Sequence, residues 1–249
     1  MDWSLNENTK VLVLAKPEKC LNYRWYDDAD KIDNRLQLLP VEYVNSSAFP
    51  CNLNKDNGLT EGMMLIKHPY IKDAFIDVTR MEDEILELKL QAMKSIGLKL
   101  GAKEIHIKSV LKISELRNFN ASAKASGWGV TVEGNVEKNK SKYEGNEYRI
   151  DWTGNSTQMT ESSFQEAMQI AKEYGLYSEP RIATLFKDRD PHHPATGTFT
   201  VFASAMKESN ERLNVAVSAS YLTAFSFQAN VANSCTLKNE ITLETTFTF

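Results

Sequence analysis

The sequence is poor in the residues and runs that mark several large classes of protein. Its three cysteines, Cys20, Cys51 and Cys235, are widely spaced and form no CxxC motif. An odd number of scattered cysteines is typical of reduced, buried thiols, whereas a disulfide framework needs pairs. The first ten residues, MDWSLNENTK, also lack the basic and apolar regions of a signal peptide. From these absences we expect a cytoplasmic protein.

Long apolar runs and basic clusters are missing as well. No stretch approaches the roughly eighteen consecutive apolar residues that a membrane-spanning helix requires. The chain of 249 residues has 29 basic and 33 acidic residues and a net charge of −4, and its lysines and arginines are spread along the sequence. Proteins that bind the phosphate backbone of nucleic acids need a basic stripe to displace counterions. We therefore expect no nucleic-acid partner.

The sequence contains none of the short motifs that identify a catalytic or cofactor-binding class. GxSxG, the P-loop, HExxH and a GxGxxG that follows a strand are all absent. His68 and His106 stand alone on predicted strands, where a single histidine is interpreted as a packing or surface residue. The sequence thus predicts no cofactor and favours a protein without catalytic activity.

One cluster could still support chemistry. The segment DRDPHHP brings two carboxylates and two imidazoles close together in the sequence: Asp188, Asp190, His192 and His193. Such groups can bind Zn²⁺ or Mn²⁺, which makes a metal-dependent hydrolase an alternative function. The other interpretation is a plain turn, because adjacent histidines on a proline-flanked loop usually point apart.

Two stretches with helical periodicity resemble each other. QAMKSIGL at 91–98 returns as QIAKEYGL at 169–176. We expect Gly97 and Gly175 to end the two helices in the left-handed conformation. The echo predicts a duplicated unit, although the common rules of helix ends explain part of it. In both stretches apolar residues recur on one face of a helix: Leu86, Leu90, Met93, Ile96 and Leu100 in the first, and Phe164, Met168, Ala171 and Tyr174 in the second.

Each helix is followed by segments with the alternation of β-strands. They include EIHIKSVLKIS after the first helix, and RIATLFK, TFTVFASAMK and the final EITLETTFTF after the second. Two further strands, VLVLA and GMMLI, are predicted nearer the start. The predicted fold class is α+β, with antiparallel-rich β-sheets and two packed amphipathic helices. We expect an N-terminal β-containing segment over 1–80 and two helix-plus-sheet units over 81–158 and 159–249.

The most informative feature is a loss of charge in the last quarter of the sequence. No charged residue occurs in 194–206 or in 213–237, and KESNER separates the two stretches. In the second stretch apolar residues occupy alternate positions, which is the period of a strand with two different faces. One interpretation is a soluble antiparallel sheet that buries the apolar face. The other is a hairpin over 194–237 that enters a bilayer, with lipid-facing side chains at Leu213, Val215, Val217, Phe225, Phe227 and Val231.

These observations lead to hypotheses of different classes. We expect a non-enzymatic binding or self-assembly protein whose β-sheet surfaces and edges pair with a protein partner or with further copies of the chain, as a homo-oligomer. The alternative is a membrane-inserting β-hairpin pore-forming protein, since helices combined with amphipathic hairpins look like the general plan of such proteins. Trp128, between two glycines, is a candidate ligand platform or membrane-interface anchor, with a core tryptophan beside a bulge as the plainer interpretation.

Overall fold

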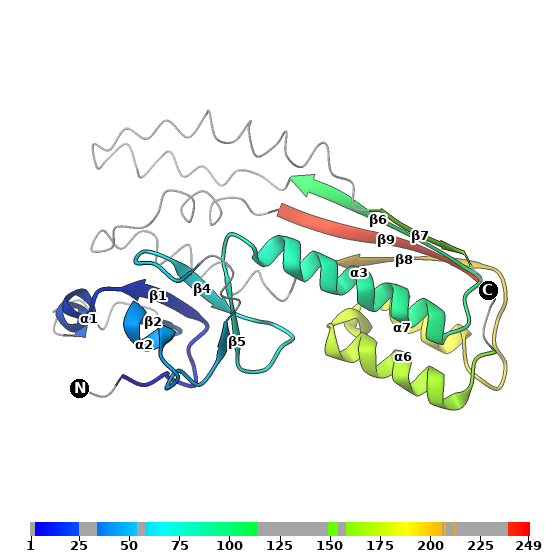
Figure 1. The fold of residues 1–249 in the computed structure, drawn as a ribbon. Coiled ribbons are helices and arrows are strands. Elements are labelled where there is room, and N and C mark those ends of the chain that lie inside the picture. Colours follow the sequence, from blue (N-terminus) through cyan, green and yellow to red (C-terminus); the bar gives the residue numbers. More distant parts are fainter. Residues whose placement is uncertain are drawn as a thin grey trace. The chain divides into compact units, whose positions relative to one another are not determined.

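The chain divides into two compact units (Figure 1). The computed structural model describes residues 3–24, 34–53, 58–113, 149–153, 158–205, 207, 212 and 239–249. The first unit comprises Met1–Glu82 and Glu208–Lys238, and the second comprises Asp83–Lys207 and Asn239–Phe249. Each unit has its own sheet, and most of the described strand pairs are antiparallel. The α+β class predicted from the sequence is confirmed.

The sheet of the first unit is mixed, with the strand order β2-β1-β4-β5-β3. Strand β1 pairs in parallel with β2 and antiparallel with β4. A parallel pair needs a crossover connection, and helix α1 (Pro17–Arg24) lies within it. The strands predicted at VLVLA and GMMLI are confirmed, the second beginning at Met64. The five strands are β1 (Val11–Ala15), β2 (Leu36–Pro40), β3 (Asn52–Leu53), β4 (Met64–Lys67) and β5 (Ala74–Asp77).

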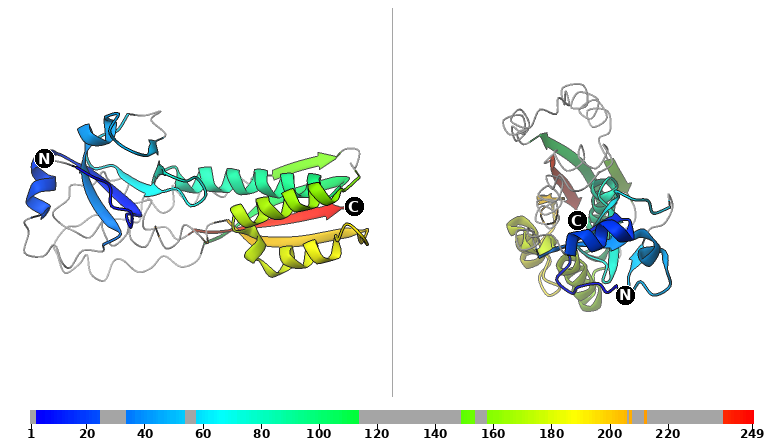
Figure 2. Two further views of the ribbon diagram at one scale, coloured as in Figure 1. Left: turned by 90° about the horizontal axis from the view of Figure 1, so that it is seen from below. Right: turned by 90° about the vertical axis from the view of Figure 1, so that its left-hand side faces the viewer.

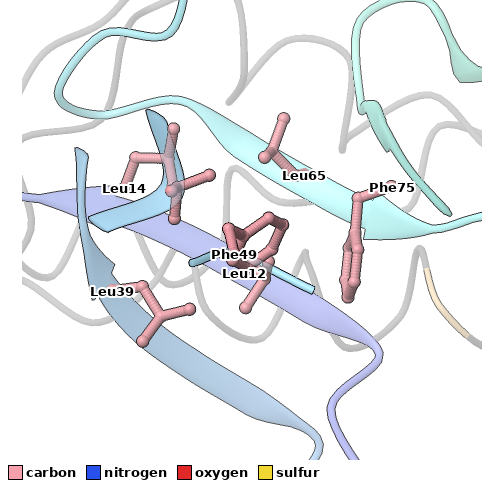
Figure 3. Packing of buried hydrophobic residues seen from close by; sticks show 7 residues of the cluster. Leu12, Leu14, Leu39, Phe49, Leu65 and Phe75 are labelled. Carbon is pink, nitrogen blue, oxygen red and sulfur yellow. The ribbon is translucent and has the colours of Figure 1, made fainter. Parts of the chain in front are cut away.

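The core of the first unit is built around β1. This strand lies between β2 and β4, and all its residues are buried, which is why it reads as a continuous apolar run without alternation. The short helix α2 (Val41–Asn45) contributes Val44 to the same core. Figure 3 shows this packing, whose buried members are Leu12, Leu14, Leu39, Val44, Phe49, Leu65 and Phe75.

The second unit has a four-stranded antiparallel sheet with helices on one face (Figures 1 and 2). The strand order is β7-β6-β9-β8. The strand predicted from EITLETTFTF is confirmed as β9, and its alternate residues from Ile241 to Phe249 are buried. The strands are β6 (Glu104–Ile113), β7 (Arg149–Thr153), β8 (Thr198–Ser204) and β9 (Asn239–Thr248). The helices are α3 (Met81–Lys99), α6 (Glu161–Glu173), the 3-10 helix η3 (Leu176–Ser178) and α7 (Pro180–Asp188).

Both helices predicted from the echoed segments are present, as α3 and α6. Four of the five predicted apolar positions lie in α3 and the fifth, Leu100, directly follows it, and all five are buried; α6 buries Phe164 and Ala171 of its predicted face. The two helices belong to one compact unit, in which β6 and β7 precede α6 and β8 and β9 follow it. A duplication, with units over 81–158 and 159–249, stays a prediction. Among the described helices, none combines the length and the hydropathy of a membrane span.

Gly97 does not end α3, so this part of the prediction is wrong. The helix continues to Lys99, and the left-handed residue after it is Gly101, with φ of 81°. Gly175 does adopt the left-handed conformation, with φ of 68°, directly after α6 and its C-cap. Gly97 instead lies where α3 crosses the sheet, because a Cβ there would meet Phe247 at 2.6 Å and Ile105 at 2.7 Å. Gly97 and Gly175 occupy the same position in the two similar segments, yet they have different structural roles.

RIATLFK was predicted as a strand, and this is also wrong because the segment belongs to helix α7. Pro180 occupies the first helical turn, where its fixed φ and missing N–H are tolerated. The residues that the helix buries are Ile182, Leu185 and Phe186, whose spacing of three and one is that of a helical stripe. The alternation that suggested a strand covers too few residues to distinguish the two periods.

Arg189, directly after α7, ties three parts of the second unit together. Its side chain is 6% exposed, and its guanidinium donates to the carbonyls of Leu100, at 2.7 Å, and Ala195. The guanidinium carbon also lies 4.0 Å from the ring centroid of Phe249. Within the described part of the chain no carboxylate pairs with Arg189, and burial lowers the pKa of the guanidinium. The charge is thus held by carbonyl dipoles and an aromatic face.

The close approach at Gly97 generates a first prediction. Gly97→Ala should destabilise the second unit by about 1–3 kcal/mol, because overpacking exceeds the gain of about 1 kcal/mol in helix propensity. Urea unfolding measures the difference. Gln91→Ala, on an exposed position of the same helix, is the control and should change stability by less than about 0.5 kcal/mol. Equal stability of Gly97→Ala and the natural chain would contradict the close approach.

A second prediction concerns Arg189. Arg189→Met should lower the free energy of unfolding by about 2–4 kcal/mol, since it leaves the buried carbonyl of Leu100 and the part-buried carbonyl of Ala195 without their donor. Thermal unfolding followed by circular dichroism checks this. Lys187→Met, an exposed basic residue in the last turn of α7, is the matched control and should have little effect. A stable Arg189→Met variant would show that the carbonyl contacts contribute little.

Candidate interaction surface

The four residues of the predicted metal site lie at the end of α7 and in the turn that follows. Asp188 is the last residue of the helix, and Asp190 is used by the backbone of the turn. Its Oδ1 accepts the N–H of His192 at 2.8 Å, and its carbonyl accepts the N–H of His193 at 3.1 Å. Nowhere among the described residues do three Cys, His, Asp or Glu side chains gather in a way that could hold a metal ion. The hydrolase hypothesis gains no support from this turn.

Trp128 and the six predicted lipid-facing residues from Leu213 to Val231 lie outside the described residues. Of the predicted hairpin over 194–237, the structure describes the first arm, which contains strand β8. The pore-forming hypothesis therefore stays a prediction.

Two of the three cysteines are described, and both are free thiols. Cys20 is buried in α1, as expected, while Cys51 is half-buried beside β3. Burial raises the pKa of the Cys51 thiol, and the charge of Asp73 adds to this effect. A raised pKa leaves less thiolate at neutral pH, so Cys51 is not an activated nucleophile.

The sheet of the second unit has two unlike faces. One face packs under the helices and is apolar, with Ile105, Val201, Leu243 and Phe247 among its buried residues. We call the other side the open face, because its residues are exposed or half-buried. They are Glu104, His106, Lys108, Asp151, Thr153, Thr198, Thr200, Phe202, Thr242, Glu244, Thr246 and Thr248.

Charges on the open face are largely paired across neighbouring strands. His106 Nδ1 lies 2.7 Å from Asp151 Oδ1, and Lys108 Nζ lies 3.1 Å from Glu244 Oε2. Both pairs join residues that are direct partners in the strand register. Exposed ion pairs of this kind contribute little to stability, at most about 1 kcal/mol each. Their consequence is a polar surface on which neighbouring side chains contact one another across the strands.

His106 and Asp151 also have the geometry of a base and its orienting carboxylate. Nucleophilic catalysis needs a third group, a hydroxyl or thiol at the other imidazole nitrogen. In this structure Nε2 of His106 faces the carboxylate of Glu104, at 3.9 Å, and no described hydroxyl or thiol is hydrogen-bonded to it. The described residues therefore supply no nucleophile for this histidine. The pair is a surface interaction.

The outer edge of β8 is the second exposed feature of this sheet. Gly197 and Phe249 each donate an N–H to the other's carbonyl, at 3.5 and 3.0 Å. Ala205 N–H donates to the carbonyl of Ile241 at 2.7 Å. Because antiparallel strands alternate between residues that face the partner and residues that face away, the intervening even-numbered residues face away from β9. They are Thr198, Thr200, Phe202 and Ser204, and their backbone groups form the outer edge.

Basic side chains from two helices occupy part of this outer edge. Lys89 of α3 is 1% exposed and donates to the Ser204 carbonyl at 2.7 Å. Arg181 of α7 donates to the Thr200 carbonyl at 3.5 Å, and its guanidinium lies 5.0 Å from the ring centroid of Phe202. The backbone N–H groups of Thr198, Thr200, Phe202 and Ser204 form no hydrogen bond within the described chain.

The strand itself has no protection against pairing. Natural edge strands usually have a lysine, a proline or a bulge that prevents contact with other strands. The seven residues of β8, TFTVFAS, include none of these, and Phe202 is 38% exposed. The sequence signal for this feature is the absence of charge from 194 to 206. It could not indicate an edge, since strand order does not follow from composition.

The chain matches no protein-family model, no curated protein and no solved structure. The geometry of the open face and of the outer edge is therefore the basis for a functional proposal.

In the first unit, His68 is a buried histidine in the loop between β4 and β5. Its Nδ1 accepts the N–H of Tyr70 at 3.0 Å and the N–H of Ile71 at 2.8 Å, which places the ring proton on Nε2. Burial, followed by the positive charge of Arg212, lowers the pKa of His68 to about 4. Protonation would put an N–H opposite two backbone donors. The loop thus depends on a neutral imidazole.

A third prediction follows from His68. The unfolded chain protonates this histidine near pH 6.5, whereas the folded unit does so only near pH 4. The contribution of His68 to the stability of the first unit should therefore fall as the pH drops from about 6.5 to about 4, by up to about 3 kcal/mol, with no further loss from this group below that range. Urea midpoints measured across this range check it.

A control variant separates the effect of His68 from that of carboxylates, which are protonated in a similar range of pH. His68→Asn keeps an acceptor for the loop but does not titrate, so its stability should depend less on pH between 6.5 and 4. The natural chain measured in parallel supplies the contribution of those carboxylates, which both proteins share. An unchanged slope in His68→Asn would contradict the role assigned to His68.

Proposed function

We propose that the chain is a non-enzymatic binding protein that pairs with an extended segment of a protein partner at the outer edge of β8. The observation that carries this proposal is the row of outward N–H groups on Thr198, Thr200, Phe202 and Ser204, which lack a hydrogen-bond partner within the described chain. An extended segment placed alongside β8 would accept hydrogen bonds from this row. Such strand addition is a general mode of protein recognition.

The edge also provides for affinity and selectivity. Main-chain hydrogen bonds supply a binding energy that is independent of the partner's side chains, and alternate side chains of the added strand would lie beside Thr200 and Phe202 on the open face. The carbonyls of Thr200 and Ser204 are each contacted by a basic group. A carbonyl oxygen has two lone pairs, so the Ser204 carbonyl can accept a second hydrogen bond from the partner while Lys89 stays in place, and the exposed Arg181 can move away from the Thr200 carbonyl.

A peptide-display experiment tests the proposal. Random extended heptapeptides are selected on the folded chain, and the affinity of each selected peptide is then measured for two variants at one position. Thr200→Pro removes an outward N–H but none of the main-chain hydrogen bonds to β9, so it should weaken binding by about tenfold or more; its loss of the hydroxyl contact with Thr246 is shared by Thr200→Ala. Thr200→Ala keeps that N–H and should bind with nearly natural affinity.

Two results would count against strand addition. One is a set of selected peptides whose affinity is the same for Thr200→Pro and Thr200→Ala. The other is a set that loses binding when Lys108 or Asp151 on the open face is replaced by Ala, since this would place the contact on that face and not at the edge. Circular dichroism of each variant confirms that the sheet is intact.

A further inference from the structure

We infer that the segment that pairs with the outer edge of β8 is β8 of a second copy of this chain, in an antiparallel pair about a two-fold axis at Val201. This inference rests on the proposed function, because it names the occupant of the same edge. A strand edge paired antiparallel with its own copy is self-complementary: each donor on one copy meets an acceptor on the other. No other segment is then needed to supply acceptors.

The register follows from the positions of the outward residues. With the axis at Val201, Thr200 lies opposite Phe202 of the second copy, and Thr198 lies opposite Ser204. Each of these opposed residues can exchange two hydrogen bonds with its counterpart. A shift of the axis to Thr200 or to Phe202 leaves one of the four outward residues beyond the end of the paired strand. The axis at Val201 is the arrangement that uses all four.

The same register accounts for an exposed aromatic ring on a polar face. Within the described part of the chain, Phe202 and Ile71 are the exposed large apolar side chains. In the paired arrangement Phe202 lies beside Thr200 of the second copy, and aromatic rings pack favourably on β-branched neighbours across strands. Since 194–206 has no charged residue, the two strands bring no like charges of their own together.

Arg181 opposes this association. It lies at the Thr200 carbonyl and over the Phe202 ring, so the two-fold axis brings Arg181 of both copies toward each other. Like charges in water repel across a distance that shrinks as salt is added. Association of the natural chain should therefore strengthen as the salt concentration rises, which is the opposite of an interface held by ion pairs. Arg181→Met should strengthen it about threefold or more at low salt.

Sedimentation equilibrium of the full chain over a range of concentrations measures the association. We expect a monomer–dimer equilibrium that Arg181→Met shifts toward the dimer, Thr200→Pro shifts toward the monomer and Thr200→Ala leaves nearly unchanged. A natural chain and an Arg181→Met variant that are both monomeric at every concentration and salt level would overturn the inference. The proposed function would survive that result if the display peptides still bound at Thr200, and would fall with it if they did not.

Disulfide mapping then tests the register, in a background of Cys20→Ala, Cys51→Ser and Cys235→Ser. Opposed residues have Cα atoms about 5.5 Å apart, within the range that a disulfide spans. Thr200→Cys mixed with Phe202→Cys should give a covalent dimer on oxidation, and neither variant should do so alone. Cross-linking of Thr200→Cys with itself, or of Phe202→Cys with itself, would move the axis and overturn the register. Absence of any cross-link in a dimeric sample would place the interface elsewhere.

Discussion

The guanidinium of Arg189 is the contact on which the second unit depends. It joins the carbonyl after α3, the loop between α7 and β8, and the ring of Phe249 at the end of β9. A buried charge is costly unless its donors are used, and here the acceptors come from segments far apart in the sequence. Their positions are therefore linked, because moving either carbonyl would leave a guanidinium donor unsatisfied and moving Phe249 would remove the ring contact. Arg189 thus fixes the end of β9, and β8 is positioned by its pairing with β9.

The close crossing at Gly97 determines which face of that sheet is open. Helix α3 can approach Ile105 and Phe247 closely because Gly97 has no side chain, and this closeness covers the apolar face. Polar residues of the same strands then point to the other side, where charges are paired across strands. The helices thus cover the apolar face of the sheet. What remains for a partner is the polar open face and the outer edge of β8.

Periodicity predicted the elements well wherever a segment is long and one-sided. The apolar face of α3 and the alternation of β9 were both visible in the sequence, because burial on one side leaves a pattern over many residues. RIATLFK was misassigned because a short segment fits both periods. Gly97 was misassigned because a glycine that allows close packing and a glycine that ends a helix look alike in sequence. The two kinds of glycine differ in the atoms that an added Cβ would contact, and only the fold determines which atoms these are.

The candidate surface was only partly predictable, for a related reason. Absence of charge in 194–206 indicated a strand suited to pairing, yet whether it lies at an edge depends on the order β7-β6-β9-β8. Contacts of Lys89 and Arg181 with the β8 carbonyls join residues that are distant in the chain, and neither residue belongs to a motif. The predicted turn at Asp190 needed no such information, since its hydrogen bonds reach two and three residues along the chain.

The position of these basic groups bears on how the edge works. A lysine on the strand itself would bring a charge into every paired arrangement and would prevent pairing permanently. Arg181 belongs instead to a neighbouring helix, is exposed, and reaches the strand through a long hydrogen bond and a ring contact. Such a side chain can change rotamer at little cost, so it weakens pairing without preventing it. The buried Lys89 lies at the end of the strand, where its contact leaves the middle of the edge unobstructed. An edge protected in this way is suited to regulated association more than to permanent isolation.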